Sequence, residues 1–281
     1  MGGLGVVLSI GKLAAGQAKY YLDQAVGWID HATAVASGVE DYYLAGVEAA
    51  GEWLGGGSLA VGLRGTVDDA PLHAVLAGER PGAGGALRAT RGTSVPGFDL
   101  TFSAPKSASV LYGIADESVR RAIQEGHDVA VRDAMGYVER MTAFARRGHG
   151  GEELIAGRGL VAAAFRHRTS RAGDPQLHTH VLVANLIEGV DGRWSALDGR
   201  RIYAHAKTAS YLYEARLRAE LTERLGVEWT PVRNGLAEIV GVPRPVLRAF
   251  SQRRAEIEAE LARVGESGEA CRWSSSDPRR R

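Results

Sequence analysis

Three of the eight histidines fall within 14 residues, in the segment FRHRTSRAGDPQLHTHV. Residues two apart on a β-strand point to the same face, about 6.6 Å from each other. His178 and His180 can therefore turn both imidazoles toward one cation, and His167 can supply a third nitrogen if the chain turns back at residues 174–177. A pair of histidines at this spacing also suits an exposed strand surface. The third histidine favours a catalytic metal site with positions open for substrate oxygens.

Tyrosines near the start of the chain are the candidate nucleophiles. Tyr20 and Tyr21 lie in AGQAKYYLDQ, and a second pair, Tyr42 and Tyr43, lies in GVEDYYLAG. A phenol has a pKa of about 10, so it needs a nearby base or cation to attack near neutral pH. Asp99, in GFDLTFSAPKSASV, is a candidate for that role. A phenol ring can equally be a core anchor of a helix.

The basic residues are unevenly distributed along the chain, although the net charge is only +1. Residues 1–157 contain 13 Lys and Arg against 18 Asp and Glu, whereas residues 158–281 contain 21 against 15. The second half therefore favours a phosphate backbone, or else has a solvated charged face. The candidate phosphate contacts are Lys106, Arg166, Arg168 and Arg171.

Two strands joined by the loop SRAGDPQ must position the histidines. Residues 157–170 and the β-branched stretch from His178 predict an antiparallel pair. Hydrophobic spacing and helix-ending residues predict helices elsewhere, and Asn234-Gly235 predicts a two-residue hairpin turn. The expected helices are residues 68–78, 117–147, 204–226 and 244–265.

The composition predicts a globular protein of the cytoplasm. The single cysteine, Cys271, cannot form a disulfide within the chain, which fits a reducing compartment. No apolar run reaches the roughly 18 residues that a membrane span needs. We therefore expect no membrane insertion.

Three separated strings in this chain resemble the relaxase domain of MobF-class conjugative proteins, the TrwC/TraI type, within the HUH endonuclease superfamily. They are Tyr20-Tyr21, DLTFSAPKS at residues 99–107, and FRHxTSRxxDPQLHTH at residues 165–180. The resemblance implies an α/β (α+β) fold whose central, mostly antiparallel sheet is flanked by helices. The histidines would lie on an inner strand pair, with the tyrosine helix over them.

The resemblance also implies an activity, which is nicking of one DNA strand at a transfer origin to give a 5′-phosphotyrosine adduct. It makes Tyr20 the first nucleophile and Tyr42 the nucleophile of a later strand transfer. His167, His178 and His180 become the metal ligands, with Mg²⁺ or Mn²⁺ as the expected ion. Asp99 would orient a ligand histidine or take the tyrosine proton.

The expected partners are single-stranded DNA and a hairpin of the origin, together with relaxosome accessory and coupling proteins. Residues 1–265 would form the relaxase domain and residues 266–281 a disordered tail. No GxxxxGK[ST] string occurs, so no nucleotide cofactor is expected in this chain.

Two positions depart from the family pattern. Arg168 stands where some members have an acidic residue, and Thr179 is less apolar than the residue expected between the two strand histidines. Two alternative functions remain open. One is an origin-binding remnant that does not cut, and the other is a three-histidine metallohydrolase that acts on a phosphoester.

Overall fold

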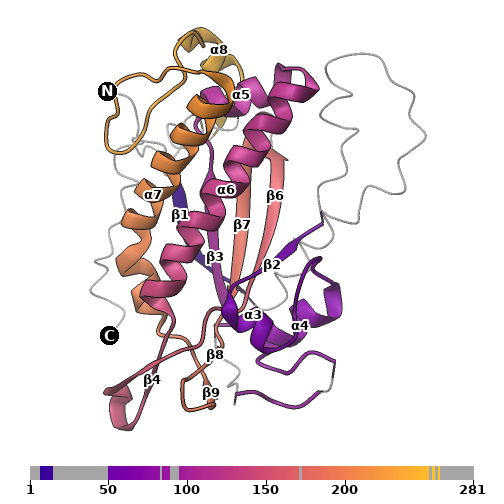
Figure 1. The fold of residues 1–281 in the computed structure, drawn as a ribbon, viewed down its shortest axis with the longest axis vertical. Coiled ribbons are helices and arrows are strands. Elements are labelled where there is room, and N and C mark those ends of the chain that lie inside the picture. Colours follow the sequence, from indigo (N-terminus) through magenta and orange to yellow (C-terminus); the bar gives the residue numbers. More distant parts are fainter. Residues whose placement is uncertain are drawn as a thin grey trace, which may run out of the picture.

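A five-stranded antiparallel sheet forms the centre of the protein (Figure 1). The computed structural model describes residues 7–14, 50–82, 84–88, 95–170, 173–252, 255–256 and 259. In sheet order, the strands are β1 (Leu8–Lys12), β3 (Gly97–Ser103), β7 (Pro175–Ala184), β6 (Ala162–Thr169) and β2 (Glu52–Leu54). The fold class expected from the sequence is confirmed, and β6 and β7 are the predicted antiparallel inner pair.

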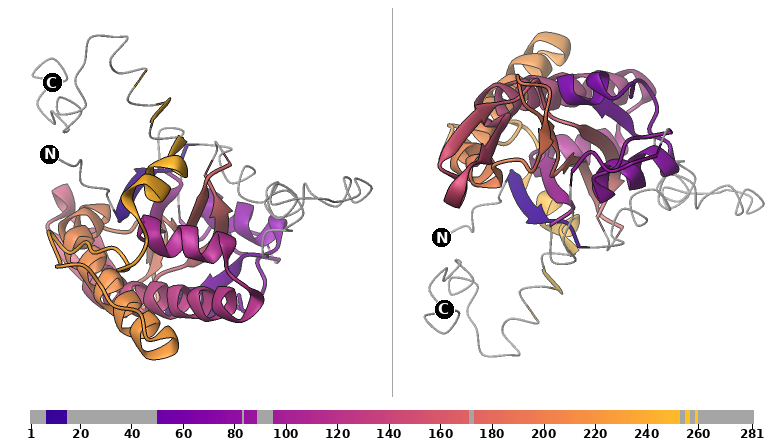
Figure 2. Two further views of the ribbon diagram at one scale, coloured as in Figure 1. Left: turned by 90° about the horizontal axis from the view of Figure 1, so that it is seen from above. Right: turned by 90° about the horizontal axis from the view of Figure 1, so that it is seen from below.

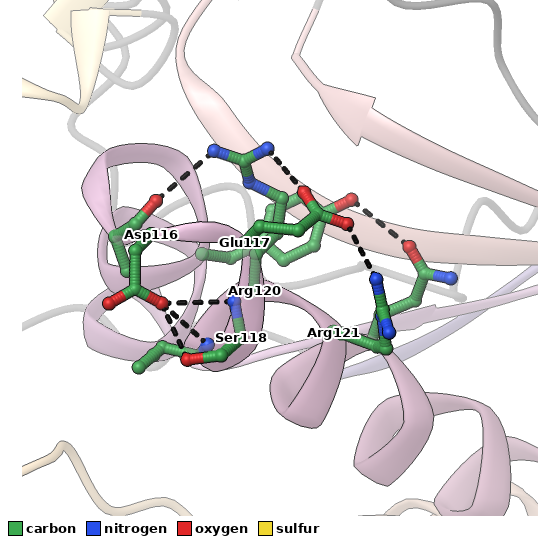
Figure 3. A network of polar contacts seen from close by, with 9 residues as sticks. Asp116, Glu117, Ser118, Arg120 and Arg121 are labelled. Atoms are coloured by element: carbon green, nitrogen blue, oxygen red, sulfur yellow. Dashed lines mark hydrogen bonds and ion pairs between the residues drawn. The ribbon is translucent and has the colours of Figure 1, made fainter.

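Two long helices, α6 (Glu117–Thr142) and α7 (Gly199–Leu225), cover one face of this sheet (Figures 1 and 2). The N-cap residue of α6 is Asp116, whose carboxylate accepts hydrogen bonds from the backbone N–H groups of Ser118 and Val119 (Figure 3). These bonds satisfy two amides that have no partner inside the helix. The core between helices and sheet includes Leu100 and Phe102 of β3 and Tyr213 of α7.

The opposite face of the sheet is covered only in part by described helices. Short helices α3 (Gly56–Ala60) and α4 (Asp69–Ala77) pack against the end of the sheet where β7 finishes (Figure 1). A second apolar core forms there, in which Leu72 and Val75 of α4 join Leu182 of β7. At the other end of the sheet lie α5 (Lys106–Ile114) and α8 (Arg244–Ala249).

Alternation along β7 decides which residues face the long helices. Leu177 and Val181 belong to the core beneath α6 and α7, whereas Leu182 belongs to the core on the opposite face. His178 and His180 share the parity of Leu182, so they lie on that opposite face. The strand therefore presents its histidines where the long helices do not cover the sheet.

The helix expected over residues 117–147 is wrong at its end. The helix stops at Thr142, and Phe144–Arg147 form β4, which pairs with β5 (Glu153–Ala156). A strand partner that comes later in the chain outweighs the local helix preference of this segment. The described part contains a second small ribbon, β8 (Ile187–Glu188) with β9 (Trp194–Ser195), and a short 3-10 turn, η2 (His149–Gly151).

The remaining expected elements are largely confirmed. Helix α4 ends at Gly78 in the left-handed conformation, and α7 begins five residues before its predicted start and ends at Gly226. The Asn234-Gly235 turn has positive φ at both residues, 52° and 85°. Helix α8 accounts for residues 244–249 of the predicted helix 244–265. None of the helices in the described ranges combines the length and hydropathy of a membrane span.

Candidate metal centre

The structure brings the three predicted histidines together. His167 lies directly opposite His178 in the β6–β7 ladder, and His180 follows two residues along β7. Each pair of rings has a centroid separation of 5.1 Å. One nitrogen from each ring lies within 4.8 Å of the other two. Three nitrogens at this spacing fit a single divalent ion as a facial set of ligands.

Two of the three rings are oriented through Nδ1. The Nδ1 of His180 is hydrogen-bonded to the Asp99 carboxylate at 2.9 and 3.0 Å, and lies 3.0 Å from the hydroxyl of Thr101. The Nδ1 of His178 donates to the carbonyl oxygen of Gln176 at 2.9 Å. A bond at Nδ1 fixes the ring and directs Nε2 toward an ion. Asp99, Thr101 and Gln176 thus give these rings the support that metal-binding histidines require.

The environment keeps the imidazoles of His167 and His178 neutral. Burial, reinforced by His178 and His180, lowers the pKa of His167 to about 3. Burial is also the main cause that lowers the pKa of His178 to about 4, against the raising effect of its bond to Gln176. A neutral imidazole has the lone pair that a metal needs. His167 and His178 are therefore ready to bind an ion at neutral pH without loss of a proton.

Lys106 has a structural bond that its sequence position did not reveal. Its ammonium donates to the carbonyl oxygen of Pro175 at 2.9 Å, and burial lowers its pKa while Asp174 and Glu238 oppose that shift. Lys106 begins α5, and Pro175 begins β7. The lysine therefore ties the start of the histidine strand to α5.

A second residue of the same segment, Ser109, was missed by the sequence analysis. Its hydroxyl accepts a hydrogen bond from the backbone N–H of Leu177 at 3.1 Å, and the N–H of Ala104 donates to the Leu177 carbonyl at 2.9 Å. The SAPKSAS segment thus braces β7 just before His178. No local pattern signals these bonds, because the partners lie 68 residues apart for Ser109 and Leu177.

The predicted phosphate contacts separate into different environments. Arg166 lies on the face opposite to the histidines and forms an ion pair with Asp128 of α6. The structure therefore does not bring Arg166 to the metal centre. Arg168 is partly exposed and lies at the register shift of β6 that follows His167. Arg171 lies outside the described residues.

The candidate nucleophiles also lie outside the described residues. These are Tyr20, Tyr21, Tyr42 and Tyr43. Of the predicted catalytic set, the described part places Asp99, which lies against His180. The tyrosine assignments therefore remain predictions from the sequence.

An antiparallel sheet with long helices on one face and three converging imidazoles on the other, one of them held by a carboxylate, defines a class of metal-dependent enzyme. The sequence profile of the TrwC relaxase family matches residues 14–280. The chain belongs to the TrwC relaxase family.

Curated relatives agree with this assignment. The multifunctional conjugation protein TraI of Escherichia coli is 32% identical over 262 residues, which cover 89% of this chain and 14% of TraI. TraI of E. coli strain K12 is 34% identical over 231 residues, which cover 78% of this chain and 13% of that protein. The chain thus spans about one seventh of the length of these relatives.

Solved structures of the conjugative relaxase TrwC share the fold. TrwC in a metal-bound complex with oriT DNA is 31% identical, with a TM-score of 0.75 over 93% of this chain and 85% of that one. TrwC with a 27-mer DNA that comprises the recognition hairpin and the cleavage site is 30% identical over the same shares, with a TM-score of 0.74.

Proposed function

We propose that this chain is a conjugative relaxase that nicks one DNA strand at a transfer origin and becomes joined to it through a tyrosine. The observation that carries the proposal is the convergence of His167, His178 and His180 on the uncovered face of the sheet. The relatives and structural neighbours support the same activity. Residues 1–265 would form the domain that has this activity, and residues 266–281 would not be needed for it.

The proposed reaction is a transesterification. The phenol oxygen of Tyr20 attacks the scissile phosphorus, and the bond from phosphorus to the 3′ oxygen breaks. The departing 3′ oxygen takes up a proton, and the phenol loses one. One phosphodiester replaces another, so reversal by the 3′ hydroxyl reseals the strand. Tyr42 would serve the later strand transfer.

The chain's own residues prepare the site for this step. A divalent ion held by the three imidazoles would polarise the scissile phosphate and offset its growing negative charge. Asp99 holds the ring of His180 at the proper angle, which favours an orienting role over that of the tyrosine's base. Mg²⁺ or Mn²⁺ is the proposed ion in the cell, although imidazoles accept several divalent ions.

The proposed substrate is single-stranded DNA next to an origin hairpin, bound in the cytoplasm with relaxosome accessory and coupling proteins. Arg168 and Arg171 are the proposed phosphate contacts near the metal, and Lys106 would contribute donors beyond the one that binds Pro175. Contacts of this kind fix the strand in position without reading its sequence.

The test is cleavage of an oligonucleotide that contains the origin's nick site, in the presence of Mn²⁺. We expect a protein–DNA adduct that survives denaturant. A phosphoester hydrolase would leave free ends, and a binding remnant would leave the strand intact. Tyr20→Phe should abolish the adduct, whereas its matched control Tyr21→Phe should not. An adduct of undiminished yield from Tyr20→Phe would contradict the assignment of the nucleophile.

A further inference from the structure

The residue between the two strand histidines has a buried partner on the far side of the sheet. Thr179 points away from the metal centre, and its hydroxyl is 2.8 Å from Nε2 of His127 on α6. The other ring nitrogen of His127, Nδ1, is 2.8 Å from the hydroxyl of Tyr213 on α7. His127 and Tyr213 are both 0% exposed, and Thr179 is 4% exposed.

We infer that His127 is a positioning residue, which holds Thr179 and through it the strand segment that carries His178 and His180. The inference rests on the proposed metal-binding role of these histidines. It assigns a function to the polar residue that lies between them. His127 itself lies across the sheet from the ion and would not touch it.

The geometry explains how one bond can fix two ligands. Thr179 is the residue between His178 and His180, so a shift of its backbone moves both imidazoles. On the site face, the Asp99 carboxylate holds the ring of His180. On the helix face, His127 holds Thr179. Hydrogen bonds on both faces of the sheet therefore hold β7 at residues 178–180, which set the relative position of the two histidine ligands.

Burial makes the bond between His127 and Thr179 selective for one position of the strand. Both nitrogens of the His127 ring are engaged, and the ring packs edge-on against Tyr213 at 5.6 Å between centroids and 84° between planes. Tyr213 in turn packs against Phe102 of β3, with centroids 5.5 Å apart. Where water has no access, a displaced strand would leave a buried polar group without a partner, which is unfavourable.

The test compares Mn²⁺ affinity with stability in variants of the full chain. Thr179→Val removes the hydroxyl and keeps the shape of the side chain. We expect it to weaken Mn²⁺ binding about 10-fold or more, as loss of supporting residues does at other metal sites. Thr179→Ser restores the hydroxyl and should restore most of the affinity.

Thr142 offers a matched control. It is also a buried threonine at 0% exposure, and its hydroxyl has no hydrogen-bond partner within the described part of the chain. Thr142→Val should therefore leave Mn²⁺ affinity unchanged. Affinity is measured by calorimetry under conditions in which circular dichroism shows every variant to be folded.

A triple variant separates positioning from ordinary core stability. Replacing all three residues, as in His127→Leu with Thr179→Val and Tyr213→Phe, removes the polar groups on both sides of the His127 ring and should recover part of the unfolding free energy lost in Thr179→Val. Positioning predicts that the Mn²⁺ affinity stays low in this variant, because the strand is no longer held by a directional bond. Recovery of affinity together with stability would overturn the inference, as would wild-type affinity in Thr179→Val.

These outcomes differ from failure of the proposed function. If wild-type protein binds no Mn²⁺, or binds it equally well in His178→Ala, both the metal centre and the positioning role are overturned. If wild-type protein binds Mn²⁺, His178→Ala binds it more weakly, and the Thr179 variants bind it as wild type does, the metal centre is supported and the positioning role of His127 is overturned.

Discussion

The two faces of the β6–β7 pair differ in how their polar residues meet. On one face, three side chains of the same kind converge, since His167, His178 and His180 bring their rings to 5.1 Å from one another. On the other face, each polar group meets a complementary one, as Arg166 meets Asp128 and Thr179 meets His127. Like groups that converge gain little from one another unless an ion joins them. The face with the three histidines, here called the convergent face, is therefore the candidate metal site. The face with the paired polar groups, here called the complementary face, supports the fold.

The largest effect is expected on the convergent face. His178→Ala removes one of three ligands, and we expect cleavage of the origin strand to fall on the order of 1,000-fold, which corresponds to several kcal/mol of lost metal catalysis. Metal affinity should fall with it. Single-turnover cleavage and calorimetry measure the two effects. Unchanged cleavage in the variant, or in wild-type protein with chelator, would show that the three histidines do not form a catalytic metal site.

The next effect concerns the carboxylate behind His180. Asp99→Asn keeps the shape but weakens the bond that fixes the ring, and we expect Mn²⁺ affinity to fall roughly 10- to 100-fold. Saturating Mn²⁺ should then restore most of the cleavage, because Asp99 acts through the ligand. If cleavage stays low at saturation with the metal site filled, Asp99 takes part in proton transfer instead.

His127 allows a smaller test on the complementary face. Burial, followed by Arg166 and His178, lowers its pKa from 6.5 in the unfolded chain to about 3. The unfolded state therefore binds the proton first, and the stability contributed at neutral pH is lost as pH falls from 6.5 toward 3. Each pH unit in that window costs about 1.4 kcal/mol.

The measurement is urea unfolding of metal-free protein at pH 6.5 and pH 5. Wild type should lose about 2 kcal/mol more over this interval than His127→Gln, which does not titrate. Equal losses in the two proteins would show that His127 is protonated in the folded state or is reached by water.

The smallest effect is expected at Arg166. Arg166→Ala should lower the unfolding free energy by about 1 kcal/mol, because it leaves the partly buried Asp128 without its cation. Cleavage and DNA affinity should not change. Arg132→Ala is the control, since its ion pair with Glu52 is about half exposed on both sides and should contribute little. A clear loss of DNA affinity in Arg166→Ala would show that the helix face also binds substrate.

The sequence predicted the convergent face better than the complementary one, for a physical reason. The i, i+2 spacing and the antiparallel return of the chain fix the histidine cluster within 14 residues. The partner of Arg166 is 38 residues away, and that of Thr179 is 52 residues away, on a helix whose placement no local pattern reveals. The end of α6 was misjudged likewise, because β5 supplies the hydrogen bonds of Phe144–Arg147.

Three imidazoles, from β6 and β7, are proposed to hold one metal ion. Electron spin-echo spectroscopy of the protein loaded with one Mn²⁺ counts the coordinated histidine nitrogens directly. We expect three such nitrogens in wild type and two in His178→Ala. A wild-type spectrum with no more than one imidazole nitrogen, or the same count in both proteins, would contradict it.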